Sequence, residues 1–274
     1  MKSLIIENEN LFVEIIPSLG GRVDKLVNKS SNYNWVWNNP FLQKKIIEHG
    51  VDYDSNWQGG WEELFPNDAI EKFSWGYGND HGDLWNHSWK IIDYSSNTIH
   101  LSTGSLGNNS SIDKVFYLNE NKLRVNYKIS IEFSDWYLFK LHLAIPIREK
   151  LEIKNTFKSI EKVDSEFGNI INTINQENFF NLTENSNFFD FGYLENLNDF
   201  VELKSKDNYL KIYYDKKFFK YLWIFQTQGS WNNHNVVVVE PASNGRKEFI
   251  KTKQKNQIMY GPSDIETFFE IEAS

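Results

Sequence analysis

Apolar and polar residues alternate along most of this chain, in short runs that end at turn-forming residues. Lys122–Ile131 alternates over its whole length, and Leu11–Ile16, Tyr209–Tyr213 and Val236–Val239 are shorter apolar or alternating runs. A period of two residues is typical of half-buried strands, whereas helices repeat every three to four residues. The pattern therefore predicts an all-β protein.

Helical periodicity is scarce in the sequence. The best short candidate is Phe41–Ile47, which follows Pro40 at a favourable N-terminal position. Asn- and Ser-rich pieces such as Gly107–Ser111 interrupt the strand patterns only briefly, as hairpin turns do. No linker composition or internal repeat divides the chain, so we expect a single domain over residues 1–274.

Composition excludes several classes of partner. The net charge of −8 argues against nucleic acid and against an anionic membrane surface, because both require a basic face. The chain has no cysteine, and no apolar stretch has the length of a signal or membrane-spanning segment. Aromatic residues make up 16%, more ring surface than a core needs, and sugars stack on such rings. We expect a cytoplasmic protein, monomer or homodimer, with a small-molecule sugar as its partner.

Polar and titratable residues gather in three segments that are otherwise aromatic or apolar. These segments are Gly59–Asp68 with Asp80–Trp89, Leu138–Pro146, and Val236–Asn244. In the second, strand alternation puts Lys140 and His142 on the face opposite Phe139, Leu141 and Leu143. In the third, Glu240 ends a doubly apolar strand just before Pro241, which is expected to stop that strand. Burying such groups is costly unless they have a partner or a function.

Together these segments resemble the aldose 1-epimerases of the galactose mutarotase-like fold, and the likeness runs through most of the chain in order. After Asn67 the family commonly has an arginine, whereas this chain continues Asp68-Ala69-Ile70. The segments that carry the resemblance are Pro17–Val23, Gly59–Asn67, His81-Gly82 with Trp89, His142 with Pro146, Tyr221–Gln226 with Val239–Ala242, and Gly261–Phe269.

The resemblance implies a large antiparallel β-sandwich with very few helices that binds a sugar and needs no cofactor. It also implies that the chain interconverts the α and β anomers of a free hexose by general acid/base ring opening. The catalytic residues would be Glu240 as general base, His142 as general acid at the ring oxygen, and His81 as a second donor. Residues expected to contact the sugar are Asn67, Glu63, Asp80 and Gln226 for hydroxyl groups, Trp61 or Trp85 for stacking, and Lys140.

Other functions remain open at this point. The chain can be a non-catalytic carbohydrate-binding protein on the same fold, or an epimerase of phosphorylated or sulfonated sugars that uses Lys140 and Arg22. Glycoside hydrolysis would need Glu240 together with Glu62 or Glu63. His81, Asp83 and His87 share a loop and are of metal-binding types, but their spacing matches no closed ligand set, so we expect no metal.

Overall fold

The computed structural model describes residues 1–104, 106–163, 176–196, 198–254 and 258–274. Within these residues, 18 strands are connected by hydrogen bonds into one continuous sheet, and the pairs of neighbouring strands run antiparallel. This confirms the predicted all-β class. The expected strands at Leu11–Ile16 and Lys122–Ile131 are β2 and β11, with the predicted bounds.

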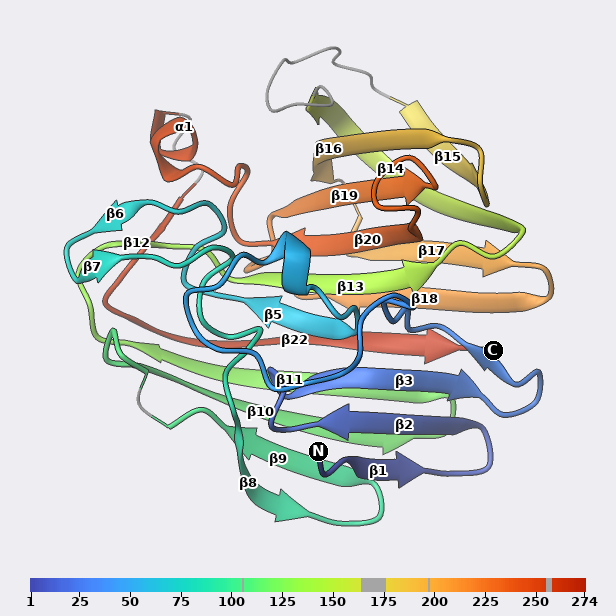
Figure 1. Cartoon of the computed structure of the whole chain (residues 1–274), viewed down its shortest axis with the longest axis horizontal. Helices are drawn as coiled ribbons and strands as arrows, with labels where there is room; N and C mark the ends of the chain where they lie inside the picture. The colour runs from blue at the N-terminus through green and yellow to red at the C-terminus, as the bar shows by residue number, and fades with distance from the viewer. Residues whose placement is uncertain (105, 164–175, 197, 255–257) are drawn as a thin grey trace.

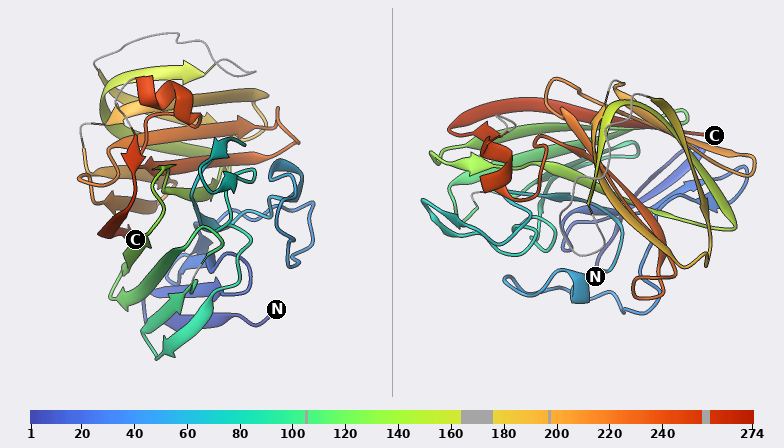
Figure 2. Two further views of the ribbon diagram at one scale, coloured as in Figure 1. Left: turned by 90° about the vertical axis from the view of Figure 1, so that its left-hand side faces the viewer. Right: turned by 90° about the horizontal axis from the view of Figure 1, so that it is seen from above.

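The sheet folds into two layers, which are seen in Figures 1 and 2. In pairing order, the first layer consists of β1 (Leu4–Glu7), β2 (Leu11–Ile16), β3 (Arg22–Asn28), β5 (Trp61–Leu64), β13 (Lys140–Pro146), β20 (Asn235–Ala242), β19 (Tyr221–Gln228) and β16 (Phe188–Asn196). The second consists of β8 (Lys90–Tyr94), β9 (Thr98–Ser102), β10 (Ser110–Asn119), β11 (Lys122–Ile131), β22 (Ser263–Ala273), β18 (Asn208–Tyr214) and β17 (Phe200–Ser205).

The long strand β14 (Lys150–Val163) joins the two layers, because it pairs with β16 of the first and β17 of the second. The remaining elements are short or peripheral. They are β15 (Gln176–Thr183) on β14, β4 (Tyr33–Asn34) on β3, the pairs β12 (Trp136–Tyr137) with β21 (Met259–Tyr260) and β6 (Lys72–Phe73) with β7 (Gly76–Tyr77), the 3-10 turn η1 (Asp54–Asn56) and the helix α1 (Phe249–Gln254).

The main core lies between the layers, and strand β13 shows how the sequence builds it. Leu141 and Leu143 point into this core together with Val237 and Val239 of β20. The alternate residues of β13 face the other way, where Ala144 belongs to a second apolar cluster. Both faces of β13 are therefore buried, and the polar side chains predicted to oppose the core do lie on the outer face of the first layer.

Two local predictions are wrong. Phe41–Ile47 forms no helix, because the Gln58 side-chain amide bonds both the N–H and the C=O of Lys45 and holds this stretch in an irregular conformation. Strand β20 does not stop at Pro241 but continues to Ala242, with Pro241 opposite Leu222 of β19. Among the described residues, no helix has the length and apolar character needed to cross a membrane.

Candidate active site

Three titratable side chains and one aromatic ring form one row across the outer face of the first layer. His142 of β13 is directly opposite Glu62 of β5, and Glu240 of β20 is opposite Trp223 of β19. The pairs Lys140–Ala242 and Leu143–Val239 set the register between β13 and β20, and this register puts His142 across from Glu240. Cross-strand neighbours lie about 5 Å apart, so these side chains are in contact range.

Lys140 forms a double ion pair at the edge of this row. Its Nζ lies 2.6 Å from Asp68 Oδ2 and 2.5 Å from Glu240 Oε2, and all three side chains are at most 5% exposed. The ammonium group also lies over the Trp223 ring, 4.3 Å from its centroid. Asp68 Oδ2 and Glu240 Oε2 therefore share one ammonium group as their partner. A carboxylate has about four acceptor positions, so Glu240 keeps lone pairs for a ligand beside this contact.

The charges of this cluster follow from burial and pairing. Burial raises the pKa of Glu240, and the Lys140 cation offsets this only in part. Burial also disfavours the charged forms of Lys140 and Asp68, but the opposite charges beside them outweigh this effect. The pKa of Lys140 is therefore raised and that of Asp68 is lowered. Asp68 is thus the fixed negative charge of the cluster, and Glu240 is the carboxylate with the higher proton affinity.

His81 reaches the site from the loop that follows β5. Asn67 closes this loop by donating to the carbonyls of Ala69 and Asn79, and the N–H of His81 bonds the Asp68 carbonyl at 2.7 Å. His81 Nδ1 lies 2.8 Å from Asp80 Oδ1. Burial opposes a charge on His81, but the carboxylates of Asp68 and Asp80 outweigh it and raise the pKa of His81. The structure therefore brings His81 and Asp80 to the site, whereas Asn67 serves the loop.

A second hydrogen-bonded group adjoins His142. The Tyr53 hydroxyl lies 2.5 Å from Glu62 Oε1 and 3.3 Å from His142 Nδ1, and the Glu62 oxygen is 3.7 Å from the same nitrogen. Tyr53 precedes η1, which crosses in front of the first layer (Figure 1). The Tyr53 ring stacks on His81 at 3.9 Å between centroids. Tyr53 thus links the two histidines.

The proton affinities in this group differ sharply. Burial, together with the positive charges of Lys140 and His81, lowers the pKa of His142 well below its usual value, so the imidazole is neutral at pH 7. Burial raises the pKa of Glu62 to about 7 against the opposing effects of Arg22 and the Tyr53 hydrogen bond. Glu62 is therefore the group in this cluster that titrates near neutral pH.

Aromatic rings cover the row, but not all of those expected. Trp57 packs edge-on against His142 with centroids 5.3 Å apart, and Trp85 packs edge-on against Tyr53 at 4.9 Å. Trp61 lies on the opposite face of β5, in the core between the layers, and its Nε1 donates to the Ala144 carbonyl. The stacking surface near His142 is thus Trp57, not Trp61.

Glu63 and Gln226 are not brought to this face. Glu63 points between the layers, where it pairs with Lys114 at 2.7 Å and accepts a hydrogen bond from Tyr127 at 2.5 Å. Gln226 is on the same face of β19 as Ile224, whereas Trp223 is on the face that carries Glu240. The Gln226 amide oxygen accepts a hydrogen bond from Gln228. These positions argue against both residues contacting the same ligand as Glu240.

Tyr53, Trp57 and Asp68 were not predicted as site residues from the sequence, and Glu62 was considered only for glycoside hydrolysis. Tyr53 and Trp57 lie in an irregular segment without periodicity, so no pattern marked them. Asp68 was noted only as a departure from the family's arginine. The strand period puts Glu62 on the face opposite Trp61 and Glu63, but only the pairing of Leu64 with Lys140 in the structure shows that this face carries the site.

The three residues that were considered as metal ligands each contact a different partner. Asp83 accepts a hydrogen bond from Asn79, the His87 ring contacts the Thr103 carbonyl, and His81 pairs with Asp80. In the described part of the chain, no group of three or more His, Cys, Asp or Glu side chains could hold a metal ion.

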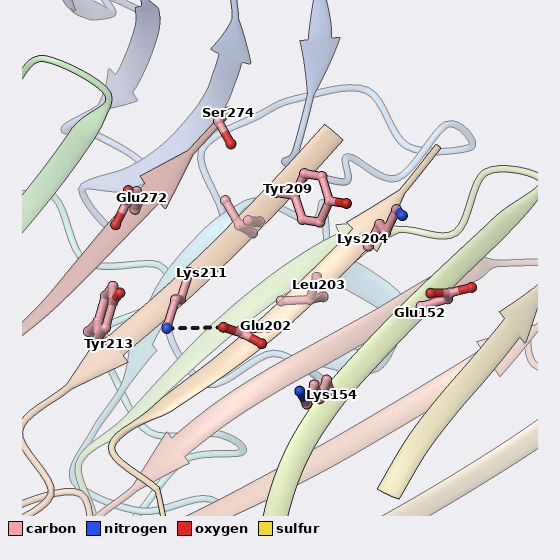
Figure 3. A pocket seen from close by; sticks show the side chains of 11 residues that line it. Glu152, Lys154, Glu202, Leu203, Lys204, Tyr209, Lys211, Tyr213, Glu272 and Ser274 are labelled. Atoms are coloured by element: carbon pink, nitrogen blue, oxygen red, sulfur yellow. Dashed lines mark ion pairs between the residues drawn. The ribbon is translucent and has the colours of Figure 1, made fainter. Parts of the chain in front are cut away.

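A separate depression of about 440 Å³ lies on the solvent side of the second layer, over β14, β17, β18 and β22 (Figure 3). Lysine and glutamate side chains line it, and Lys211 pairs with Glu202 at 3.0 Å. Lysine ammonium groups cover its tyrosine rings: Lys204 lies over Tyr209 and Lys211 over Tyr213. The rings and charges named here are thus engaged with one another.

The sequence matches no protein-family model and no curated protein. Solved structures are similar over the whole chain. A galactose mutarotase-like protein from Lactobacillus casei has a TM-score of 0.73 at 15% identity, with 100% of both chains covered. An aldose epimerase homologue from Caenorhabditis elegans has a TM-score of 0.69 at 10% identity, covering 100% of this chain and 98% of that one. A galactose mutarotase-like protein from Clostridium acetobutylicum has a TM-score of 0.66 at 13% identity, covering 99% and 95%. The chain therefore has the galactose mutarotase-like β-sandwich fold.

Proposed function

We propose that this protein is an aldose 1-epimerase that interconverts the α and β anomers of a free sugar in the cytoplasm, without a cofactor. The supporting observation is that Glu240 and His142 oppose each other on adjacent strands and share one face. Mutarotation needs one group that removes the proton of the anomeric hydroxyl and another that protonates the ring oxygen. A carboxylate and an imidazole in this arrangement meet that requirement.

Glu240 is the general base. Its carboxylate has more lone pairs than the Lys140 contact uses, and burial raises its proton affinity toward the range in which reversible transfer is efficient. The Lys140 cation holds this side chain in place and balances its negative charge before the reaction. His81, whose charge is favoured by Asp68 and Asp80, is a donor for a neighbouring sugar hydroxyl.

His142 acts as a proton carrier, not as a stored acid. A neutral imidazole has one N–H and one lone pair, so it can give a proton from one nitrogen only while it gains one at the other. Nδ1 faces Tyr53, which bonds Glu62. When Glu62 is ionised, Tyr53 donates to Glu62 and Nδ1–H donates to Tyr53, which leaves Nε2 as an acceptor. When Glu62 is protonated, both hydrogen bonds reverse and Nε2 carries the proton.

The reaction then proceeds with protonated Glu62 and ionised Glu240. Glu240 takes the anomeric hydroxyl proton as the C1–O5 bond breaks, and His142 Nε2 gives its proton to O5. Tyr53 passes its proton to Nδ1 and receives that of Glu62, so the imidazole stays neutral. The open-chain aldehyde rotates about C1–C2, and the reverse transfers close the ring on either face.

The charge pairing favours a neutral sugar over a phosphorylated or sulfonated one. Lys140 is already paired with two carboxylates, and Arg22 bonds the Gly59 carbonyl and Asp24. Glycoside hydrolysis is disfavoured as well, because Glu63 faces the core and the Glu62 carboxylate accepts the hydrogen bond of the buried Tyr53 hydroxyl.

Polarimetry on freshly dissolved α-glucose and α-galactose tests the proposal. The wild-type protein should accelerate the change in rotation, and Glu240→Gln should reduce this rate by about 10²- to 10⁴-fold with an unchanged circular dichroism spectrum. An unchanged rate in the variant would eliminate the assignment of Glu240. Sugar-dependent quenching of tryptophan fluorescence without acceleration by the wild type would instead favour a non-catalytic sugar-binding protein.

A further inference from the structure

A second pocket, of about 480 Å³, opens on the same side of the first layer as the candidate active site. Its walls come from three segments: the irregular stretch that begins at Asn39, the turn η1, and the connection between β19 and β20. Phe41, Asp54, Trp231 and His234 are among the side chains that line it. The volume is in the range of small-molecule sites in proteins.

The lining of this pocket has the composition of a sugar site. The Phe41 side chain is 64% exposed and Trp231 is half-buried, so ring surface is available for C–H faces of a pyranose. Side-chain amides, a serine hydroxyl and the Asp54 carboxylate supply hydrogen-bonding groups for hydroxyls. No lysine or arginine lines the described pocket, which disfavours an anionic ligand.

His234 contributes a buried donor that lacks a partner. Burial lowers the pKa of His234, so its imidazole is neutral. The Asn39 amide nitrogen, which donates to the Trp57 carbonyl, lies 3.5 Å from Nε2. Nε2 is thus the acceptor, and the hydrogen is on Nδ1, which has no hydrogen-bond partner among the described residues. An unsatisfied buried donor costs about 1–3 kcal/mol, and a ligand hydroxyl oxygen that reaches it would remove this cost.

The Trp57 ring lies between the candidate active site and two side chains that line the pocket. The Trp57 ring packs on His142 at 5.3 Å, on Trp231 at 6.2 Å and on His234 at 6.4 Å between centroids. Along β20, Val236 follows the Trp231–His234 segment and precedes Glu240 by four residues. At about 3.3 Å per residue this is about 13 Å, the scale of two linked sugar rings.

We propose that this pocket binds a second pyranose ring, so that the substrate is the reducing-end unit of a disaccharide or longer oligosaccharide. The proposal rests on the proposed function for the anomeric chemistry, but the pocket itself is defined by residues that take no part in proton transfer. The reducing ring occupies the row of Glu240 and His142, and its neighbour lies beyond Trp57 between Phe41 and Trp231.

Two substitutions in one loop test this proposal. Phe41→Ala removes an exposed ring of the pocket, and Ile46→Ala removes an equally exposed side chain that does not line it. We expect Phe41→Ala to lower kcat/KM for the mutarotation of maltose, lactose or cellobiose about tenfold, mainly through KM, and to leave glucose and galactose within twofold. Ile46→Ala should leave both classes unchanged. An equal effect of Phe41→Ala on monosaccharides and disaccharides, or no effect on either, would overturn the proposal.

Calorimetry with the wild-type protein separates this proposal from the proposed function. If no sugar is turned over, the enzymatic proposal fails, but tighter binding of a disaccharide than of its reducing-end monosaccharide, lost in Phe41→Ala, still supports the second subsite. If none of the three disaccharides binds more tightly than its reducing-end monosaccharide, the subsite proposal is refuted whether or not mutarotation is observed.

Discussion

The substitution Glu62→Gln separates the proton-relay role of this residue from its structural role. Glutamine keeps the shape of the side chain, and its amide N–H can donate to the Tyr53 oxygen. Tyr53 can then still donate to His142, but the amide supplies no proton for transfer. Besides Tyr53 and His142, the groups that act on Glu62 are Arg22 of β3, Glu63 on the opposite face of β5, and His81. None of these changes in the variant.

The expected changes in stability and activity with pH follow from the pKa of Glu62, which burial raises from 4.5 to about 7. The folded protein thus binds this proton more tightly than the unfolded chain does. The stability that goes with it is fully present below about pH 4.5 and is lost as the pH rises to about 7. Each pKa unit corresponds to about 1.4 kcal/mol, so the loss is about 3 kcal/mol. For activity, the protonated fraction falls to about a tenth by pH 8, and kcat/KM should fall with it.

Polarimetric rates and urea unfolding between pH 5 and pH 8 measure both effects. Glu62→Gln should lose the decline in kcat/KM around pH 7, run at least tenfold slower than wild type at pH 6, and gain stability relative to wild type as the pH rises. Glu63→Gln is the matched control, because this neighbouring buried carboxylate faces the core: without its charge the decline in activity should move to lower pH but persist. A decline near pH 7 that persists in Glu62→Gln, or that Glu63→Gln also abolishes, would refute the relay.

Three further outcomes are expected. Lys140→Met leaves Asp68 and Glu240 without their shared cation, which should cost about 3–5 kcal/mol in urea unfolding at pH 7 and raise the pH at which activity appears. In NMR titrations, His81 should have a pKa above 6.5, because Asp68 and Asp80 favour its charge, and Asp68→Asn should lower it. Gln58→Ala removes both hydrogen bonds to the Lys45 backbone and should speed limited proteolysis near Lys45 without changing the affinity of the active site for monosaccharides.

Alternation was sufficient to predict the all-β class, because it marks strands directly, as at Lys122–Ile131, and the family resemblance implied the sandwich. It also predicted which face of β13 carries Lys140 and His142, since faces within one strand follow from the period alone. It could not predict how faces on different strands combine, because pairing register depends on long-range contacts. Gln226 shows this: Glu240 pairs with Trp223, and a shift of one residue would have put Gln226 on the site face.

The missed residues have a related cause. Tyr53 and Trp57 belong to an irregular segment whose path is fixed by tertiary hydrogen bonds, such as that from the Tyr53 N–H to Asp80. The same reason explains the helix wrongly expected at Phe41–Ile47, where a distant glutamine amide replaces the local hydrogen bonds of a helix. Loops that are shaped by distant partners leave no periodic signal in their own sequence.

The proton-transfer groups that contact the sugar lie on strands, whereas the groups of the second pocket lie on connecting segments, and this difference matters for redesign. The groups assigned to proton transfer at the sugar, Glu240 and His142, are on paired central strands whose backbone is fixed by the sheet. The rings and amides assigned to a second sugar unit come from connecting segments around Phe41 and Trp231. Grafting these segments from a protein of the same fold should therefore change which sugars are accepted and leave the pH dependence of turnover where it was.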